Sequence, residues 1–200
     1  MGLTFHEITD VNDDLLLHWL DLYEVSFPPE EKLLVSRFLW LLKPDILEKP
    51  DCHLLAVLDQ GGEFVGLMCY DIAHSINAYS LWYFANVPQR RGSGLGAACY
   101  AEVIRRASEA GADLLVFEVE VPEDSADADI SRRRIEFYRR QGAKLVRGIH
   151  FTQKIGDHTR RIQMNLMAHP LRPIPPADVL EVLKNYYGDD LRQVGEVSLE

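Results

Sequence analysis

The spacing of apolar positions changes along the chain from two residues to three or four and back, which is typical of alternating strands and helices. Apolar residues at spacings of three and four over residues 12–27 predict a helix that Asn12 caps and that Pro28 and Pro29 end. A second helix is expected directly after these prolines, over residues 30–41. Short apolar runs bounded by turn residues predict the first strands. These strands are expected over residues 3–8, 53–58, 64–72 and 79–87.

The second half of the chain alternates helices and strands. A long helical pattern over residues 95–110 ends at Gly111, and an apolar strand follows it. A further helix and two last strands come next, and a proline-rich linker then leads to a short amphipathic helix. These elements are expected over residues 114–121, 129–141, 144–151, 161–168 and 179–187. We therefore expect one α/β (α+β) domain over residues 1–169, with a linker and a helix over residues 170–200 that pack on or extend it.

Composition and charge exclude several classes of protein. The chain has 200 residues, which suits a single domain with a sizeable core, and a formal net charge of -10. This acidic balance disfavours nucleic-acid binding and favours a cationic partner such as an amine. No apolar run is long enough to cross a bilayer and the first residues lack the features of a signal peptide, so we expect a cytoplasmic protein that binds no membrane. Cysteines and histidines show no metal-ligand spacing, so no metal is expected.

The stretch over residues 87–96 carries the clearest chemical signal. It reads Val-Pro-Gln-Arg-Arg-Gly-Ser-Gly-Leu-Gly and lies between a predicted strand and a predicted helix. Glycines at alternate positions leave the backbone bare, so that its N–H groups can approach a ligand closely. The start of a helix favours an anion, and Arg90 and Arg91 add positive charge beside it. This stretch therefore predicts a phosphate-binding turn.

Three kinds of phosphate-binding turn compete. A Walker A loop ends in Gly-Lys-Ser/Thr, and this turn has no lysine. A dinucleotide fingerprint reads G-x-G-x-x-G, whereas the glycines here read G-x-G-x-G. Glu118 does lie where the ribose-binding acid of that fold would be. The turn, however, comes late in the chain, after several apparently antiparallel strands, which argues against that fold. The third pattern, Gln/Arg-x-x-Gly-x-Gly/Ala, is matched at every fixed position by residues 89–94. The turn resembles the acyl-CoA loop of the GNAT N-acetyltransferases, while a glycine turn that serves packing alone remains the alternative.

The predicted helix over residues 129–141 carries a second resemblance to this family. GNAT proteins commonly show Asn-x-x-Ala-x-x-x-Tyr-x-x-x-Gly-Phe here, and the chain keeps Tyr138 and Gly142 at this spacing. It departs from the pattern at Ser131, Arg134 and Ala143. The resemblance covers roughly residues 3–168. It implies the GNAT acyl-CoA N-acyltransferase fold, with a central mixed, mostly antiparallel sheet of six to seven strands flanked by about four helices, plus the C-terminal helical appendix.

The resemblance also implies a reaction and a set of cofactor-binding residues. An acetyl group would pass from acetyl-CoA to a primary amine by direct attack in a ternary complex, without a metal. Residues of the loop, of the strand before it and of the tyrosine helix would bind coenzyme A. They are Ala85, Asn86, Val87, Gln89, Arg90, Arg91, Gly92, Ser93, Gly94, Leu95, Gly96, Arg134 and Tyr138.

Roles in catalysis follow less directly. Tyr138 matches the acid that the family uses for the leaving thiolate, and a packed aromatic residue is the alternative. Glu118 and Glu120 alternate on one strand face and are candidates for the general base, against the alternative of a solvated or arginine-paired face. Tyr83 and His150 are lesser candidates. The family's acceptor pocket corresponds here to Phe27, Glu30, Glu31 and Tyr83, although both glutamates also suit a helix start.

Several functions stay open at this point. The acceptor is expected to be a small-molecule or peptide amine, and family members often form homodimers. An acyl-CoA-binding module without catalytic activity is a second hypothesis, because the family's glutamate on the strand before the loop corresponds to about Ala78 here. A nucleotide-binding domain, which would bind NAD or ATP, is a third.

Overall fold

The computed structural model describes residues 2–44, 46, 49–154 and 161–200, without the side chains of Glu30 and Lys154. The helices are α1 Leu16–Ser26, α2 Val35–Leu41, α3 Leu95–Glu109, α4 Ala128–Arg140 and α5 Pro176–Tyr187. The strands are β1 Thr4–Ile8, β2 Asp51–Leu58, β3 Phe64–Ala73, β4 Ala78–Asn86, β5 Leu114–Glu120, β6 Lys144–Lys154, β7 Arg161–Pro170 and β8 Leu191–Leu199. None of the helices in this described part of the chain combines the length and apolar character that crossing a membrane requires.

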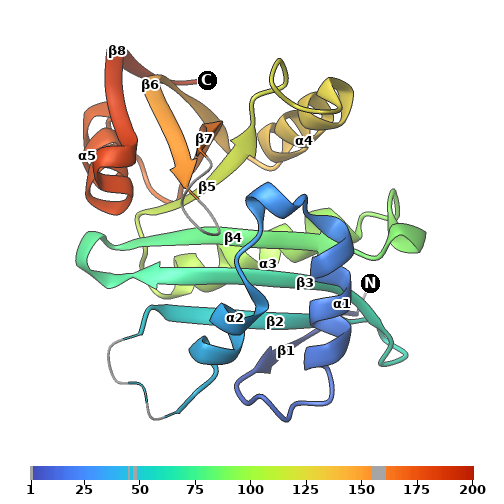
Figure 1. The fold of residues 1–200 in the computed structure, drawn as a ribbon. Helices are drawn as coiled ribbons and strands as arrows, with labels where there is room; N and C mark the ends of the chain where they lie inside the picture. Colours follow the sequence, from blue (N-terminus) through green and yellow to red (C-terminus); the bar gives the residue numbers. More distant parts are fainter. Residues whose placement is uncertain (1, 45, 47–48, 155–160) are drawn as a thin grey trace. The chain divides into compact units, whose positions relative to one another are not determined.

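Hydrogen bonds link the strands in the order β1-β2-β3-β4-β5-β7-β6-β8 (Figure 1). The β4–β5 pairing is parallel, whereas β1–β2, β2–β3, β5–β7, β6–β7 and β6–β8 are antiparallel. The mixed, mostly antiparallel sheet and the helices of the predicted fold are confirmed. The expected count of six to seven strands was low, because the sheet has eight. The strand not expected is β8, whose residues 192–196 are exposed and therefore give no apolar alternation.

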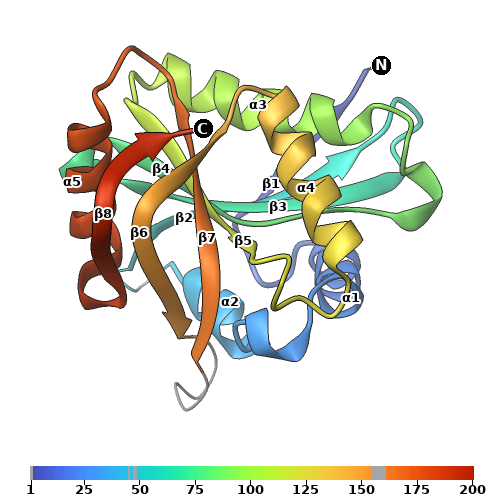
Figure 2. The ribbon, with the colours of Figure 1, turned by 90° about the horizontal axis from the view of Figure 1, so that it is seen from above.

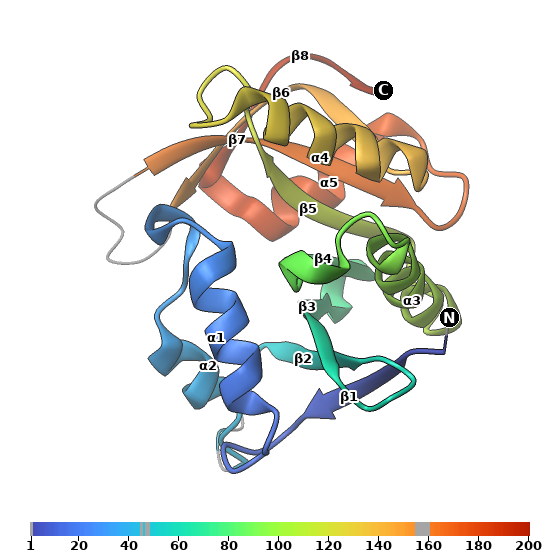
Figure 3. The ribbon, with the colours of Figure 1, turned by 90° about the vertical axis from the view of Figure 1, so that its right-hand side faces the viewer.

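The chain divides into two compact units, of which the first comprises Met1–Ile72 and Leu81–Glu102. Figure 3 shows α1 and α2 on one side of strands β1, β2 and β3. The side chains of Trp19, Tyr23 and Phe38 are fully buried between these layers. The Trp19 and Tyr23 rings are stacked, and Phe38 meets both edge to face, with ring centroids 4.9 Å apart for Tyr23 and Phe38. Burial of three large aromatic side chains gives this unit its core.

The segment between α1 and α2 differs from the prediction. Helix α1 begins at Leu16 rather than at Asn12, and the second helix is divided into a short 3-10 helix, Pro29–Glu31, and α2, which begins at Val35. The backbone of Leu33 explains the division. Its carbonyl accepts a hydrogen bond from Tyr23 Oη at 3.0 Å, and its N–H donates to Tyr83 Oη at 3.0 Å. These tertiary bonds use the peptide groups that a continuous helix would need.

The second unit comprises Ala73–Ser80 and Val103–Glu200. Figure 2 shows α5 beside β8, with β6 and β7 following. Val179 and Leu183 of α5 are fully buried against the apolar side chains of this unit's strands, such as Val116 and Leu166. The C-terminal residues are therefore part of this unit's hydrophobic core and of its sheet.

Gly148 of β6 is expected to be indispensable for the β6–β8 pairing. Its φ is +78°, and a Cβ there would lie 2.1 Å from the carbonyl oxygen of Glu196. Gly148→Ala should therefore lower the free energy of unfolding by about 3 kcal/mol or more, since backbone would have to move. Gly111→Ala is the matched control, because Gly111 has φ +74° but no heavy atom within 4 Å of such a Cβ. Urea unfolding should show a loss of only about 1 kcal/mol for the control, and equal losses would contradict the assignment.

Candidate functional site

The glycine turn leads from β4 through a short 3-10 helix, Pro88–Arg90, into α3. Gly92 and Gly94 have φ values of +75° and +85°, which L side chains rarely adopt. No heavy atom lies within 4 Å of a Cβ built at either residue, so the backbone here faces open space. The first N–H groups of α3, which have no partner within the helix, follow directly. The turn therefore has the bare backbone and the helix start that an anion such as a phosphate needs.

The two arginines of the turn differ in their surroundings. The Arg90 guanidinium lies 2.7 Å from Asp59 Oδ2 and 3.2 Å from Glu63 Oε2, both in the hairpin between β2 and β3. The Arg90 carbonyl accepts a hydrogen bond from Ser93 Oγ at 2.6 Å. Arg90 therefore ties the turn to the hairpin. Arg91 is exposed and is the better placed of the two to offer its charge to a ligand.

The end of β4, just before the turn, is held by contacts with β3 and α3. The Val87 N–H donates to the Val65 carbonyl at 3.0 Å, and the Asn86 side chain lies beside Gly66, where a Cβ would come within 2.7 Å of Asn86 Oδ1. Cys99 of α3 contacts the same Asn86 oxygen through Sγ at 3.8 Å. Burial, with a smaller effect of Glu102, raises the pKa of the Cys99 thiol to about 12. A thiol of this kind is not a nucleophile near neutral pH.

The parallel pairing of β4 with β5 is short. It joins Ala78–Ser80 to Leu114–Val116 and ends there, while β5 continues to Glu120 in antiparallel pairing with β7. Ser80 is 1% exposed and its hydroxyl is among the buried polar atoms of the described residues that have no hydrogen-bond partner.

Tyr138 lies on α4 in an aromatic environment. Its side chain is 7% exposed, and its ring centroid is 4.4 Å from that of Phe117 on β5. Burial raises the pKa of the Tyr138 hydroxyl to about 12, against the opposing effect of the Arg134 charge one turn earlier. The hydroxyl therefore keeps its proton throughout the neutral range and can act as a hydrogen-bond donor.

The two candidate bases on β5 have different surroundings. Glu120 Oε2 accepts a hydrogen bond from Ser131 Oγ at 2.7 Å and forms an ion pair with Arg134 Nη1 at 3.0 Å. Ser131 is 1% exposed. Glu118 is half-buried two residues earlier on the same strand. The structure thus couples Glu120 to the two positions of α4 at which the family pattern is not kept, so Glu120 is held as a charged partner of Arg134.

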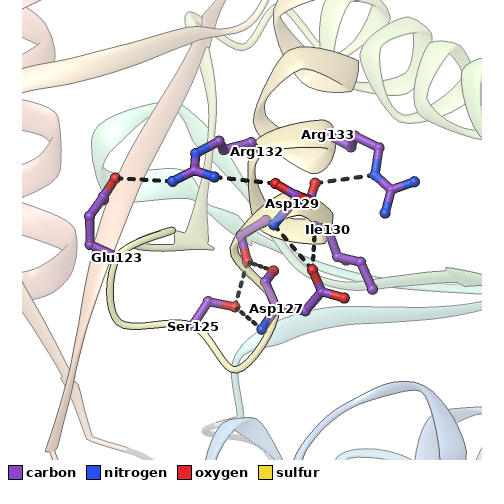
Figure 4. Close-up of polar contacts among 8 residues, drawn as sticks. Glu123, Ser125, Asp127, Asp129, Ile130, Arg132 and Arg133 are labelled. Atoms are coloured by element: carbon purple, nitrogen blue, oxygen red, sulfur yellow. Dashed lines mark hydrogen bonds and ion pairs between the residues drawn. The ribbon is translucent and has the colours of Figure 1, made fainter.

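The start of α4 is ordered by side chains that the sequence patterns did not single out. Asp127 caps the helix by accepting hydrogen bonds from the N–H groups of Asp129 and Ile130 at 3.1 and 3.0 Å (Figure 4). Ser131 Oγ also lies 2.6 Å from Ser125 Oγ. An Asx residue just before a helical pattern was the available signal for this cap. No sequence signal pointed to the partners of Ser131, which lie six and eleven residues away.

Three members of the expected acceptor pocket come together in the first unit. Tyr83 Oη donates to the Glu31 carbonyl at 3.0 Å, and the Tyr83 and Phe27 ring centroids are 4.9 Å apart. The side chain of Glu30 lies outside the described residues. The Tyr83 hydroxyl is bonded to this segment and its ring is 6% exposed, so Tyr83 packs against Phe27, and its role in the acceptor pocket stays a prediction. His150, the other lesser candidate for the base, lies on β6 with Nε2 3.4 Å from Thr152 Oγ1.

Comparisons with known proteins bear on this arrangement. The sequence model described as "Acetyltransferase (GNAT) family" matches residues 14–143. A GNAT-family protein from Bacteroides thetaiotaomicron is 21% identical, with a TM-score of 0.72 over 92% of this chain and 98% of that one. The ribosomal-protein-S18-alanine N-acetyltransferase from Escherichia coli is 15% identical, with a TM-score of 0.58 over 87% and 97%. At these identities the structures show a shared fold. A comparison with curated protein sequences found no match.

The matched residues include both features that the sequence singled out, the glycine turn in front of α3 and the tyrosine on α4. They make up more than half of the chain, and the fold is shared with the solved GNAT-family protein. The chain therefore belongs to the GNAT family of acetyltransferases.

Proposed function

We propose that this protein transfers the acetyl group of acetyl-CoA to a primary amine by direct attack in a ternary complex. The observation that carries the proposal is the open turn at Gly92 and Gly94, held by Arg90 in front of α3 in a chain of this family. Its backbone fits a diphosphate, because the positive φ values turn the peptide groups without side chains in the way.

The residues that would hold coenzyme A lie in the loop and the strand before it. Backbone N–H groups of residues 92–96 and the Arg91 guanidinium would bind the phosphates. The end of the β4–β5 pairing after Ser80 supports a role for the remaining edge of β4, through Ala85–Val87, in pairing with the pantetheine arm. The bound cofactor supplies a thioester, whose acyl group is activated for transfer.

The protein's own groups would then move protons. An alkylamine is largely protonated at neutral pH and attacks only after it loses a proton. Glu118 and Glu120 are the candidate bases, and Glu120 is also bonded to Ser131 and Arg134. Tyr138 would donate a hydrogen bond to the departing sulfur, since burial keeps its hydroxyl protonated. The buried Cys99 takes no part, which supports direct transfer.

The proposal also covers the domain organisation of the chain and the amine that accepts the acetyl group. We place the acetyltransferase domain at residues 1–169 and regard residues 170–200 as an extension of it. The net charge of -10 favours a cationic acceptor, either a small molecule or a peptide. The named Escherichia coli relative acts on an alanine of a ribosomal protein, which is also an amine acceptor.

Thermal unfolding with acetyl-CoA, coenzyme A, NAD and ATP in parallel tests the proposal. A ligand at about 100 times its dissociation constant stabilises the folded state by about 2.7 kcal/mol, so a clear rise in Tm is expected for acetyl-CoA and coenzyme A alone. A panel of amines, followed by the release of free thiol, then tests turnover. A shift with NAD or ATP alone would overturn the proposal, and binding of coenzyme A without turnover on any amine would favour the inactive module.

A further inference from the structure

A hollow of about 420 Å³ lies in the second unit, where α4 faces β6, β7 and the segment after β5. Its apolar wall includes Val121, Ile135 and Leu145. Its charged lining comprises the guanidinium groups of Arg132, Arg139 and Arg147 and the carboxylates of Glu123 and Glu136, so the cations exceed the anions by one. The volume lies within the range of about 300–1,000 Å³ that is typical of small-molecule sites. A cluster of arginines in a chain with a net charge of -10 is notable, because the chain as a whole repels anions.

The charged residues of α4 that line the hollow lie on a different face of the helix from the residues considered for acetyl transfer. Ser131, Arg134 and Tyr138 recur at spacings of three and four and form one face of the helix. Of the helix residues that line the hollow, Arg132, Glu136 and Arg139 lie on the neighbouring face, and Ile135, four residues after Ser131, borders both faces. Figure 4 shows the start of α4, where Arg132 points toward Glu123 while Arg133 points the other way.

Each guanidinium of the hollow has a carboxylate neighbour that orients it. Arg139 Nη1 lies 2.7 Å from Glu136, and the Glu136 side chain is 53% exposed. Arg147 Nε lies 3.0 Å from Glu200, which is 55% exposed, and Arg132 Nη2 lies 3.8 Å from Glu123, which is 71% exposed. Pairs this exposed contribute little to stability, about 0–1 kcal/mol. They hold the arginines in place but use only part of the five N–H groups that each guanidinium offers.

One of the remaining donors is buried. Among the described residues, Arg139 Nε has no hydrogen-bond partner although it is shielded from solvent. A buried donor without an acceptor is unfavourable. An acceptor in the hollow would remove this penalty once the guanidinium, whose side chain is 35% exposed, turned its Nε–H toward it, and a carboxylate matches the planar, forked geometry of a guanidinium. The apolar wall would at the same time cover a short hydrocarbon body.

We propose that this hollow binds a small carboxylate with an apolar body, at a site separate from the residues that serve acetyl transfer. Its oxygens would accept hydrogen bonds from Arg139 and Arg147, and its hydrocarbon part would lie on Ile135 and Leu145. Inorganic phosphate offers the charge without the apolar part, and the corresponding neutral amide offers the apolar part without the charge. Both should therefore bind more weakly than the carboxylate.

Hexanoate is the probe, with hexanamide and inorganic phosphate as comparators. Titration of the full chain, followed through the arginine Nε–Hε signals in ¹H–¹⁵N spectra, should show a saturable shift of the Arg139 signal with hexanoate. Arg139→Gln should weaken hexanoate binding by about tenfold or more, measured by calorimetry. Arg133→Gln is the matched control, because Arg133 is on α4 and bonds to the Asp129 carbonyl but does not line the hollow.

Three results would overturn the proposal. They are the absence of a saturable shift with hexanoate, equal binding of hexanamide or phosphate, and an equal loss of hexanoate affinity in both variants. Thermal unfolding of each variant without ligand establishes that it is folded. The titration is made without acetyl-CoA and then repeated with coenzyme A. A failure of the protein to bind coenzyme A, which concerns the proposed acetyl-transfer site, can then be distinguished from a failure to bind hexanoate. Displacement of hexanoate by coenzyme A would place the probe at the cofactor site and would also overturn the proposal.

Discussion

The double variant Gly92→Asp with Gly94→Asp is expected to lose the stabilisation that acetyl-CoA gives to the wild-type protein, with an affinity at least about 100-fold lower. Two effects act together. The φ values of +75° and +85° disfavour any residue with a Cβ, so the turn would leave its present geometry. The added carboxylates would also repel the phosphates that the turn is proposed to bind. Calorimetry with coenzyme A measures the loss directly.

Gly111→Asp is the control for this variant. Gly111 also has a positive φ, +74°, and open space around it, but it lies after the other end of α3. Its substitution by Asp should cost a similar amount of stability per residue while coenzyme A affinity stays within about twofold. Retained affinity in the double variant would show that the turn does not bind the cofactor. Equal losses in both variants would point to a general effect of destabilisation.

Tyr138→Phe is expected to lower kcat for acetyl transfer by about 100-fold or more and to leave KM for acetyl-CoA nearly unchanged. The hydroxyl has a pKa of about 12, above that of a typical thiol at about 8.5. Complete proton transfer to the sulfur would therefore be unfavourable by roughly 5 kcal/mol, so the hydroxyl acts chiefly as a hydrogen-bond donor. Such a bond strengthens as the sulfur gains charge, which is why kcat rather than KM should change.

The raised pKa of Tyr138 also sets the expected pH dependence of activity and stability. Tyr138 should cause no inflection in kcat between about pH 6 and pH 9, since it stays protonated there. Because folding raises its pKa above the usual 10, its contribution to stability is present below about pH 10 and is lost as the pH rises towards 12. Tyr138→Phe should therefore retain more of its stability at about pH 11 than the wild-type protein does. An unchanged kcat in a folded variant would contradict the catalytic role.

Local patterns predicted much of the fold and the turn. Glycines at alternate positions between a strand and a helix are a short-range signal, so Gly92 and Gly94 could be found without knowledge of any distant contact. The helix that carries Tyr138 was likewise visible from its spacing. Gly92 and Gly94 have the positive φ values that their glycine pattern predicts. The use of the turn as a phosphate site and the roles of Tyr138, Glu118 and Glu120 stay predictions.

Contacts between residues that are far apart in the sequence explain the structural features that the sequence patterns did not predict. Arg90 is joined to Asp59 and Glu63, which precede it by 31 and 27 residues, and no periodicity reports such a pairing. The expectation of a continuous second helix was wrong because Leu33 bonds to Tyr23 and Tyr83. Strand β8 was missed because its exposed residues carry no apolar alternation. In each case tertiary partners decided the local conformation.

The tie between Arg90 and the β2–β3 hairpin has a consequence for the thermodynamics of binding. A flexible glycine-rich segment would lose conformational entropy when it closed on a ligand. Here the two carboxylates and the Ser93 hydroxyl restrain the turn in the free protein. Part of the ordering cost is therefore met during folding, and ligand association is left with a smaller entropic penalty. High salt, which screens exposed ion pairs, should make that penalty larger even for a ligand without charge.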